Sequence, residues 1–172
     1  MSALPVLAIT MGDPASIGPE IGVKALLQEN IHTICRPMLV GDAAVFQQII
    51  DKLKLPAKVN AVSKVTDAKF EIGAIDVYDL NITDISKLEF GKIDAMCGEA
   101  SFQAVKKASE LAIAGEVDGT VTGPINKKSI NAAGHHFAGH TEIYAHYTGT
   151  KKYAMLLVED NINVIHVSTH VS

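Results

Sequence analysis

Residues 4–20 read LPVLAITMGDPASIGPE, and this stretch decides the fold. The apolar run at residues 4–10 predicts a buried β-strand, and the glycines and proline at residues 11–18 predict a loop. Pro19 and Glu20 favour the first turn of a helix, because proline fits that position and an acid suits the positive end of the helix dipole. We expect this helix to run to about residue 29. A strand, a loop and a helix in this order are typical of an α/β fold.

The remainder of the chain repeats this alternation. Further strands are predicted at residues 37–41, 74–80 and 120–122. Helices are predicted at residues 43–53 with Asp42 as the N-cap, at residues 94–114 with Gly115 ending the helix, and after residue 127 with Gly134 ending the helix. Two final strands at residues 154–158 and 164–169 are expected to form a hairpin. We therefore predict an α/β fold with a mostly parallel sheet flanked by helices. The chain stops at Ser172 directly after its last strand, so we expect the fold to be incomplete.

Composition excludes several classes of protein. The chain has 172 residues, a formal charge of -4 and only 5% aromatic residues, which disfavours a nucleic-acid partner. The two cysteines, Cys35 and Cys97, lack the spacing of a disulfide framework or a thiolate zinc site, and this favours the cytoplasm. No window reaches the roughly 18 consecutive apolar residues of a membrane span. We expect a soluble, cytoplasmic protein with one core.

Histidine is the informative residue type, because six of the seven histidines fall after residue 134. A zinc hydrolase would use His166 and His170 as a ligand pair four residues apart, and this requires a helix. The surrounding segment is β-branched and predicts a strand, where four residues span about 13 Å. Two histidines that far apart cannot share one metal ion. At most one of them is a ligand, and His170, at the strand end, is better placed to reach a cleft.

Two loops also carry candidate chemistry. Gly139-His140-Thr141-Glu142 predicts a tight turn into a helix with Thr141 as the cap. This is either a simple capping motif or, because an imidazole and a hydroxyl lie beside free helix N–H groups, a binding place for a carboxylate or phosphate. Residues 122–128 lack the second glycine and the lysine-hydroxyl pair of a phosphate-binding P-loop, and the chain contains no GxGxxG motif. These residues alone therefore predict no nucleotide site.

Four motifs together resemble those of a known family. Residues 8–20, residues 121–127, Gly139-His140-Thr141-Glu142 and Ser168-Thr169-His170 are similar, in order and separation, to the signatures of the PdxA family of 4-hydroxythreonine-4-phosphate dehydrogenases, which act in pyridoxine biosynthesis. The resemblance implies a fold like that of isocitrate and isopropylmalate dehydrogenases, a homodimer, NAD and a divalent metal ion such as Zn, Mg, Mn or Co. The implied reaction is oxidation and decarboxylation of a small phosphorylated hydroxy acid.

The resemblance also assigns residues. His140 and Thr141 match the substrate-binding pair, and His170 matches the first of three metal-binding histidines. Asn126 and Lys127 match a loop that faces the same cleft, with Asn126 binding substrate and Lys127, like His140, serving catalysis. The Met11-Gly12-Asp13 form of the first motif is more similar to the branch that handles 4-phosphothreonate or 4-phosphoerythronate.

The chain departs from the family in two ways. Ser16 stands where the family usually has glycine, which predicts a side chain where the loop backbone needs freedom. Family members are roughly twice this length, so residues 1–172 are expected to be the N-terminal portion of a two-domain dehydrogenase, inactive alone. A metal-free phosphate or acyl transferase on a related fold, and a non-catalytic fragment or dimerisation module, are the alternatives.

Overall fold

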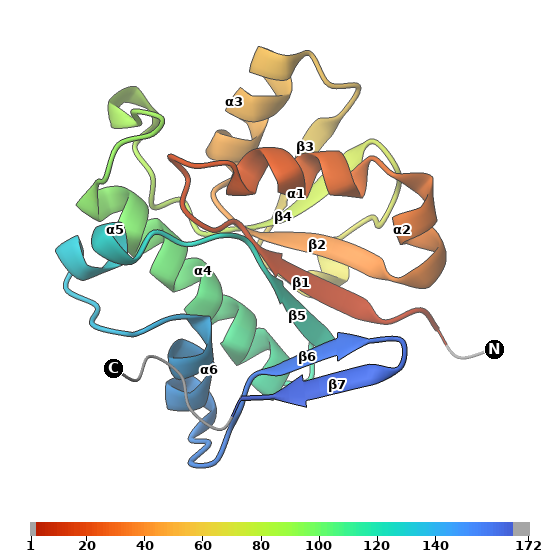
Figure 1. Cartoon of the computed structure of the whole chain (residues 1–172). Helices are drawn as coiled ribbons and strands as arrows, with labels where there is room; N and C mark the ends of the chain where they lie inside the picture. The colour runs from red at the N-terminus through yellow and green to blue at the C-terminus, as the bar shows by residue number, and fades with distance from the viewer. Residues whose placement is uncertain (1–2, 167–172) are drawn as a thin grey trace.

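The computed structural model describes residues 3–166, which form one three-layer α/β/α body and a separate hairpin. The five strands of the central sheet are β1 (Val6–Thr10), β2 (Arg36–Gly41), β3 (Lys58–Val62), β4 (Ala74–Asp79) and β5 (Gly119–Thr122). All neighbours pair in parallel, in the order β3-β4-β2-β1-β5 (Figure 1). The predicted α/β class and parallel sheet are confirmed.

Helices cover both faces of this sheet. The helices are α1 (Gly18–Leu26), α2 (Glu29–Ile34), α3 (Ala43–Leu53), α4 (Ala95–Ile113), α5 (Lys127–Ala132) and α6 (His140–Thr148), with short 3-10 turns η1 (Val65–Asp67) and η2 (Ile85–Lys87). Val23, Phe46 and Ile50 of α1 and α3 pack on one face. Ala104, Ala108 and Leu111 of α4 pack on the other, where small side chains allow a close approach to β1 and β2.

The sequence predicted most of these elements but missed α2 and β3, which lie among polar residues with little periodicity. Asp42 occupies the N-cap position of α3, yet its side chain does not cap the helix. Its carboxylate instead accepts hydrogen bonds from the backbone of Ile82 at 3.0 Å and Thr83 at 2.7 Å. The side chain of Asp79, at the end of β4, accepts from the Ala43 N–H at 2.9 Å. The predicted N-cap position of Asp42 is confirmed, but its carboxylate binds the neighbouring loop instead of the N–H groups of the helix.

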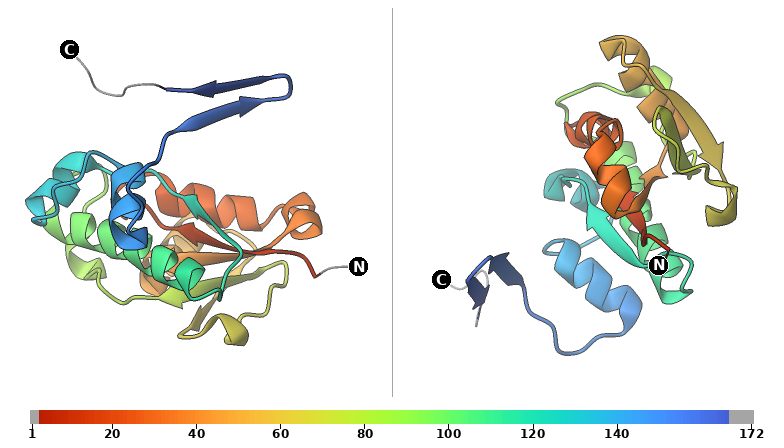
Figure 2. Two further views of the ribbon diagram at one scale, coloured as in Figure 1. Left: turned by 90° about the horizontal axis from the view of Figure 1, so that it is seen from below. Right: turned by 90° about the vertical axis from the view of Figure 1, so that its right-hand side faces the viewer.

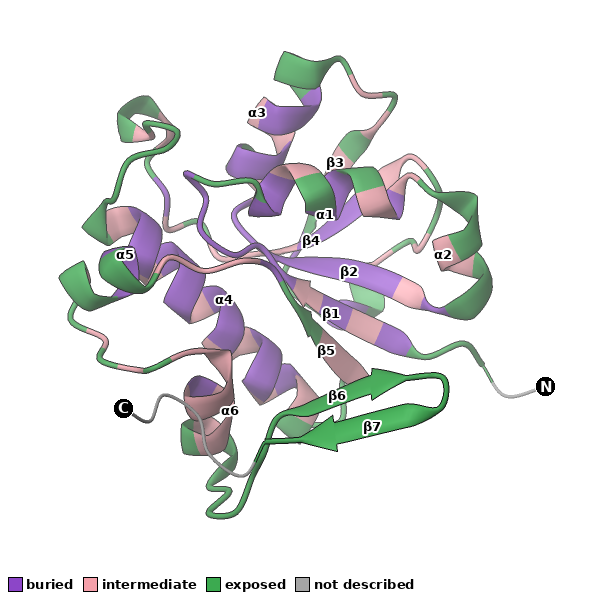
Figure 3. Cartoon of the chain, viewed as in Figure 1, coloured by how far each residue is buried: buried purple, intermediate pink, exposed green. Residues whose placement is uncertain are grey.

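The remaining two strands form the predicted antiparallel hairpin, β6 (Leu156–Glu159) and β7 (Ile162–Ile165). It projects away from the main sheet (Figure 2) and is exposed along its whole length (Figure 3). Residues 167–169, the expected end of the second strand, lie outside the described residues. Leu157 and Val164 face one side while Leu156 and Ile165 face the other, so both faces of the hairpin are apolar.

Candidate functional site

Two loops at the carboxyl end of the sheet are joined to one another. The loop after β1 (residues 11–17) and the loop after β5 (residues 123–126) come from adjacent strands. The Asp13 N–H donates to the Pro124 carbonyl at 2.9 Å, and the Gly123 N–H donates to the Thr10 carbonyl and to Thr10 Oγ1, both at 3.1 Å. Gly12 has a φ of +73°, and a Cβ there would lie 2.5 Å from the Pro124 carbonyl oxygen. The loops therefore meet backbone to backbone, which only glycine permits.

Ser16, where the family's glycine was expected to be needed, causes no strain. Among residues 3–166, the non-glycine residues with left-handed backbone are Lys54, Phe70 and Asn81, so Ser16 is not one of them. Its side chain is exposed, and its N–H donates to the Asp13 carbonyl at 3.0 Å. The expectation of a misplaced Cβ is therefore wrong, because this turn does not use the conformation that favours glycine.

Asp13 is the buried acid of this loop pair, only 1% exposed. Its Oδ1 accepts from the Ala15 N–H at 2.8 Å. Its Oδ2 is buried with no hydrogen-bond partner of standard geometry in the described chain, although Ser129 lies close by. Burial raises the pKa of Asp13, the hydrogen bond from Ala15 and the Ser129 side chain oppose this shift, and the nearby charge of Asp94 adds to it.

A cavity of about 480 Å³ opens beside Asp13. Its walls combine apolar side chains, including Ile17 and Phe90, with the amines of Lys52 and Lys92. Asn126 also lines it. The Asn126 side chain is the N-cap of α5 and accepts from the N–H groups of Lys128 at 3.0 Å and Ser129 at 3.3 Å, so the amide fixes the start of this helix.

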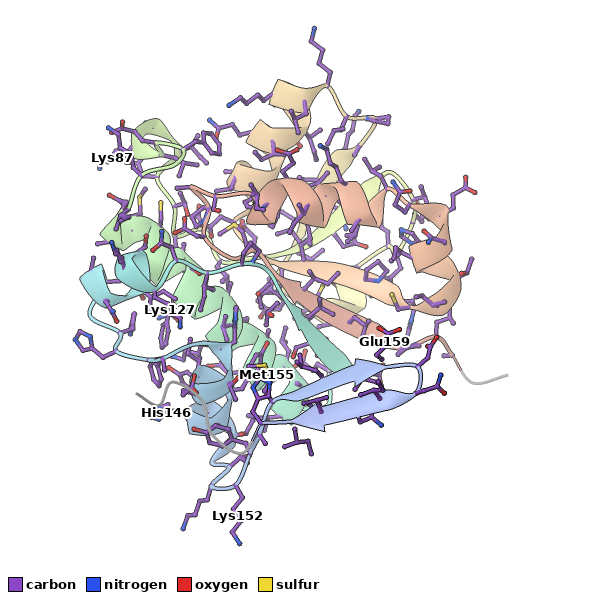
Figure 4. The ribbon with its side chains drawn as sticks, viewed as in Figure 1. Lys87, Lys127, His146, Lys152, Met155 and Glu159 are labelled. Atoms are coloured by element: carbon purple, nitrogen blue, oxygen red, sulfur yellow. The ribbon has the colours of Figure 1, made fainter. Side chains whose placement is uncertain are left out.

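A second cavity, of about 370 Å³, lies where α6 meets the end of β5. His140 and Thr141 line it together with Thr122. The structure thus brings together the histidine and threonine predicted to bind substrate. Asn126 lines the first cavity, and Lys127, exposed at the start of α5, lines neither of the two (Figure 4).

His140 is half-buried, and its environment favours the uncharged imidazole. Its Nε2 is buried, and no residue among 3–166 forms a hydrogen bond with it. Burial lowers the pKa of His140, and the nearby Gly123 backbone opposes the shift without reversing it. The imidazole is therefore mainly uncharged at neutral pH, and its buried Nε2 has no hydrogen-bond partner in the described chain.

Thr141 does not cap α6, and this corrects the sequence prediction. The helix begins at His140, the N-cap position is Gly139, and no side chain in the described chain caps it. Thr141 lies inside the first turn because the fully extended backbone of Gly139, with φ 176°, lets the helix start two residues earlier than predicted. The first N–H groups of a helix have no intrahelical partners, so this end of α6 can accept an anion.

The clustered histidines do not form one centre. His135 contacts Glu99 at 2.6 Å and stacks on Phe102 with ring centroids 3.6 Å apart, which is a packing role. His146 contacts Phe137 and Tyr147 edge-on, on the exposed side of α6 (Figure 4). Within residues 3–166, no three histidine, cysteine or acidic side chains are grouped so that they could hold a metal ion.

His166 is exposed after β7, and His170 lies outside the described residues, so its assignment as a metal ligand stays a prediction. Both cysteines are buried and free. Among the described residues, no helix has the length and apolar content needed to cross a membrane.

Sequence reasoning missed two polar groups of this site. Asp13 stands in the quoted motif, and an acid between Gly12 and Pro14 in a loop after a strand is a usable signal of a polar turn. Tyr144 lines the second cavity with a buried hydroxyl. Its place four residues after His140 is a signal only once a helix is known to begin there.

Residues 33–172 match the sequence profile of the family described as pyridoxal phosphate biosynthetic protein PdxA. The chain is 39% identical over 168 residues to a D-threonate 4-phosphate dehydrogenase of Cupriavidus necator, covering 98% of this chain and 50% of the relative. The chain thus spans about half the length of the curated relatives it matches.

Solved structures give the same result. A 4-hydroxythreonine-4-phosphate dehydrogenase from Burkholderia phymatum superposes with a TM-score of 0.92 at 38% identity, over 99% of this chain and 52% of the other. A terephthalate 1,2-cis-dihydrodioldehydrogenase from Burkholderia xenovorans superposes with a TM-score of 0.71 at 28% identity, over 95% and 48%. The architecture is therefore shared by dehydrogenases with differently named substrates.

Proposed function

Since this chain belongs to the PdxA family, we propose that it forms part of an NAD-dependent and divalent-metal-dependent dehydrogenase. The proposed reaction is oxidation and decarboxylation of a small phosphorylated hydroxy acid. The names of the relatives, D-threonate 4-phosphate and 4-hydroxythreonine-4-phosphate dehydrogenase, support this substrate class. In this proposal the chain is the N-terminal portion of a two-domain protein, and the remaining residues complete the site.

The observation that carries the proposal is the buried Nε2 of His140, which has no hydrogen-bond partner in the described chain. A buried ring nitrogen without a partner costs free energy, and a catalytic role or a bound ligand is one reason that native proteins keep such a group. In the His140 cavity this nitrogen lies beside Thr141 and the uncapped start of α6. An oxygen-rich anion would satisfy all three.

The loop residues fit part of a nicotinamide nucleotide. In the cavity beside Asp13, apolar walls suit the face of a ring, and Lys52 and Lys92 suit phosphate oxygens. The unpartnered Oδ2 of Asp13 would accept from a donor group. We propose that these residues hold part of NAD, with the larger part of the cofactor site outside the chain.

The described residues do not by themselves fit a metal ion. We propose His170 as one ligand in the complete protein. When bound, NAD accepts hydride and a divalent ion polarises the substrate hydroxyl.

In this proposal, the residues of this chain bind the substrate and orient it. The start of α6 and Thr141 hold an anionic group, and His140, uncharged at neutral pH, accepts or donates a hydrogen bond at the substrate. Lys127, exposed at the start of α5, is free to approach a substrate phosphate from the same edge of the sheet. The apolar cluster of Phe102, Val105 and Ile143 fixes α6 beneath His140.

We also propose that the complete protein is a homodimer. The hairpin has apolar side chains on both faces, and a two-stranded hairpin is at best marginally stable alone in water. Cover from a second copy, or from the remainder of the protein, would bury these side chains.

His140→Asn in the full-length protein tests the proposal. We expect a loss of kcat/KM of about 100-fold or more in NADH formation from D-threonate 4-phosphate. His136→Asn is the matched control, because His136 is exposed and lines neither cavity. Unchanged turnover in His140→Asn would contradict the assignment.

His170→Ala and treatment with EDTA test the metal. Both are expected to abolish NADH formation while the protein stays folded, and addition of a divalent ion should restore activity only to the chelated wild type. Turnover that survives EDTA would instead favour the metal-free transferase.

A further inference from the structure

Tyr144 lies one helical turn after His140, and side chains four residues apart share one side of a helix, with Cβ atoms about 5–6 Å apart. Both line the cavity at the end of β5. The Tyr144 hydroxyl is buried and has no hydrogen-bond partner of standard geometry within the part of the chain that the structure describes. Both residues thus line the cavity, and each also carries a buried polar atom that makes no hydrogen bond of standard geometry within the described chain.

The phenol ring is held so that its hydroxyl keeps this place. Tyr144 packs against the cluster of Phe102, Val105 and Ile143, which fixes the ring. The Thr120 hydroxyl of β5 lies nearby. Burial raises the pKa of Tyr144, and Thr120 opposes this shift only in part, so the hydroxyl remains protonated and able to donate.

Most of the residues that line the cavity carry a hydroxyl group, although the surface that they expose to it is mainly apolar, and none of the described ones carries a permanent charge. It consists of Thr122, His140, Thr141, Tyr144, Ala145, Thr148, Thr150 and Tyr153. Hydroxyl groups dominate, and His140 is neutral because burial lowers its pKa. A substrate hydroxyl placed here finds donors and acceptors, whereas an ammonium group finds no carboxylate to balance its charge.

We propose that Tyr144 is a specificity-determining residue that donates a hydrogen bond to a neutral hydroxyl group of the substrate, beside His140. This inference rests on the proposed function and deepens it. The Tyr144 hydroxyl would favour phosphorylated polyhydroxy acids, such as the threonate and erythronate phosphates, over the amino acid 4-phosphohydroxy-L-threonine. The amino acid carries an ammonium group in place of one hydroxyl.

Tyr144→Phe in the full-length protein tests this role, because it keeps the ring and removes only the hydroxyl. The kinetics are measured with D-threonate 4-phosphate and with 4-phosphohydroxy-L-threonine. We expect KM for the hydroxy acid to rise about tenfold with a smaller change in kcat, the size typical of one lost hydrogen bond. The preference in kcat/KM for the hydroxy acid should fall by a similar factor.

Tyr147→Phe is the matched control. Tyr147 lies on the same helix and packs on Phe102 and His146, and it is not among the residues that line this cavity. It should leave the preference between the two substrates unchanged. Equal losses on both substrates, no change in Tyr144→Phe, or the same shift in Tyr147→Phe would each overturn the inference.

A substrate analogue keeps the inference testable if Tyr144→Phe does not fold. Analogues of D-threonate 4-phosphate that lack one or other hydroxyl are tested as competitive ligands of the wild type, and one of them should bind about tenfold more weakly. Equal affinity for every deoxy analogue and the parent would overturn the inference. A wild type that forms no NADH with either phosphorylated acid would instead contradict the proposed function itself.

Discussion

The backbone N–H of Asp13 donates a 2.9 Å hydrogen bond to the carbonyl oxygen of Pro124, and this bond ties together two loops that are more than a hundred residues apart in the sequence. The loops follow adjacent parallel strands, β1 and β5, whose ends meet at one edge of the sheet. Ligands of open α/β sheets bind beyond this edge. The position of both candidate cavities therefore depends on this junction.

Gly12→Ala should destabilise the junction. At φ +73° an alanine is strained, and its Cβ would also lie 2.5 Å from the Pro124 carbonyl oxygen. We expect a loss of about 2–4 kcal/mol in the free energy of unfolding, measured by urea denaturation. Gly134→Ala is the matched control, because Gly134 has φ +91° but an added Cβ meets no atom within 4 Å in the described structure. Equal losses in the two variants would contradict a contact-based role for Gly12.

Asp13→Asn should change how stability depends on pH. Because burial raises the folded-state pKa of Asp13 above its unfolded value of 3.8, the folded protein holds this proton more tightly. The wild type therefore loses stability as pH rises from 3.8 through the raised pKa, and the ionised carboxylate is a cost at neutral pH. Asparagine keeps an acceptor for the Ala15 N–H and removes this cost. The stability of the variant relative to the wild type should therefore increase as pH rises through that window.

Asp84→Asn provides a control of opposite sign. Hydrogen bonds from the Ser86 side chain, Lys87 and the Ser86 backbone lower the pKa of Asp84 to about 2. Any stability that Asp84 contributes is present above its unfolded pKa and lost as pH falls toward 2. Urea denaturation across pH distinguishes the two variants, and a parallel pH profile for Asp13→Asn and the wild type would contradict the burial argument.

His140 should titrate below its ordinary value of 6.5, since burial lowers its pKa. NMR of the ring protons across pH measures this directly. A base with a depressed folded pKa makes stability fall as pH drops from 6.5 to that lower value, because the unfolded chain takes up the proton first. His140→Gln should flatten this part of the stability profile. A His140 resonance that titrates at or above 6.5 would show that the ring is not buried as described.

His135→Ala should weaken the packing between α4 and the segment before α6. The mutation removes the 2.6 Å contact with Glu99 and the stacking on Phe102. A loss of about 1–3 kcal/mol in the free energy of unfolding is expected. The neighbouring residue supplies the control, because His136 is exposed and His136→Ala should have an effect within about 0.5 kcal/mol. Similar losses at both positions would refute the packing role.

The hairpin offers a test of self-association. Val158 is 69% exposed and lies on the face that it shares with Asn163 of the paired strand. Val158→Lys should leave the thermal unfolding of the main body unchanged, because the side chain makes little contact with it. If this face joins two copies, sedimentation should show a weaker dimer. An unchanged dimer would place the interface elsewhere.

Much of the fold could be predicted from the sequence because the signals are local. The apolar run before Thr10 marks β1, and the three- and four-residue spacing of apolar residues before Gly115 marks α4. Strand β3 and helix α2 were missed because partly polar segments of five or six residues carry too little periodicity. Asn126 caps α5 because the sequence places it directly before the helix.

The sequence alone determined the class of fold and the residues that carry the family's motifs, because both follow from side-chain type and spacing along the chain. Only the tertiary structure decided that Asp13 is buried against the loop of Pro124, that His140 and Tyr144, each with a buried unpartnered atom, line one cavity, and that His135 packs on Phe102. Burial and hydrogen-bond satisfaction depend on which distant segments meet, and local sequence does not encode that.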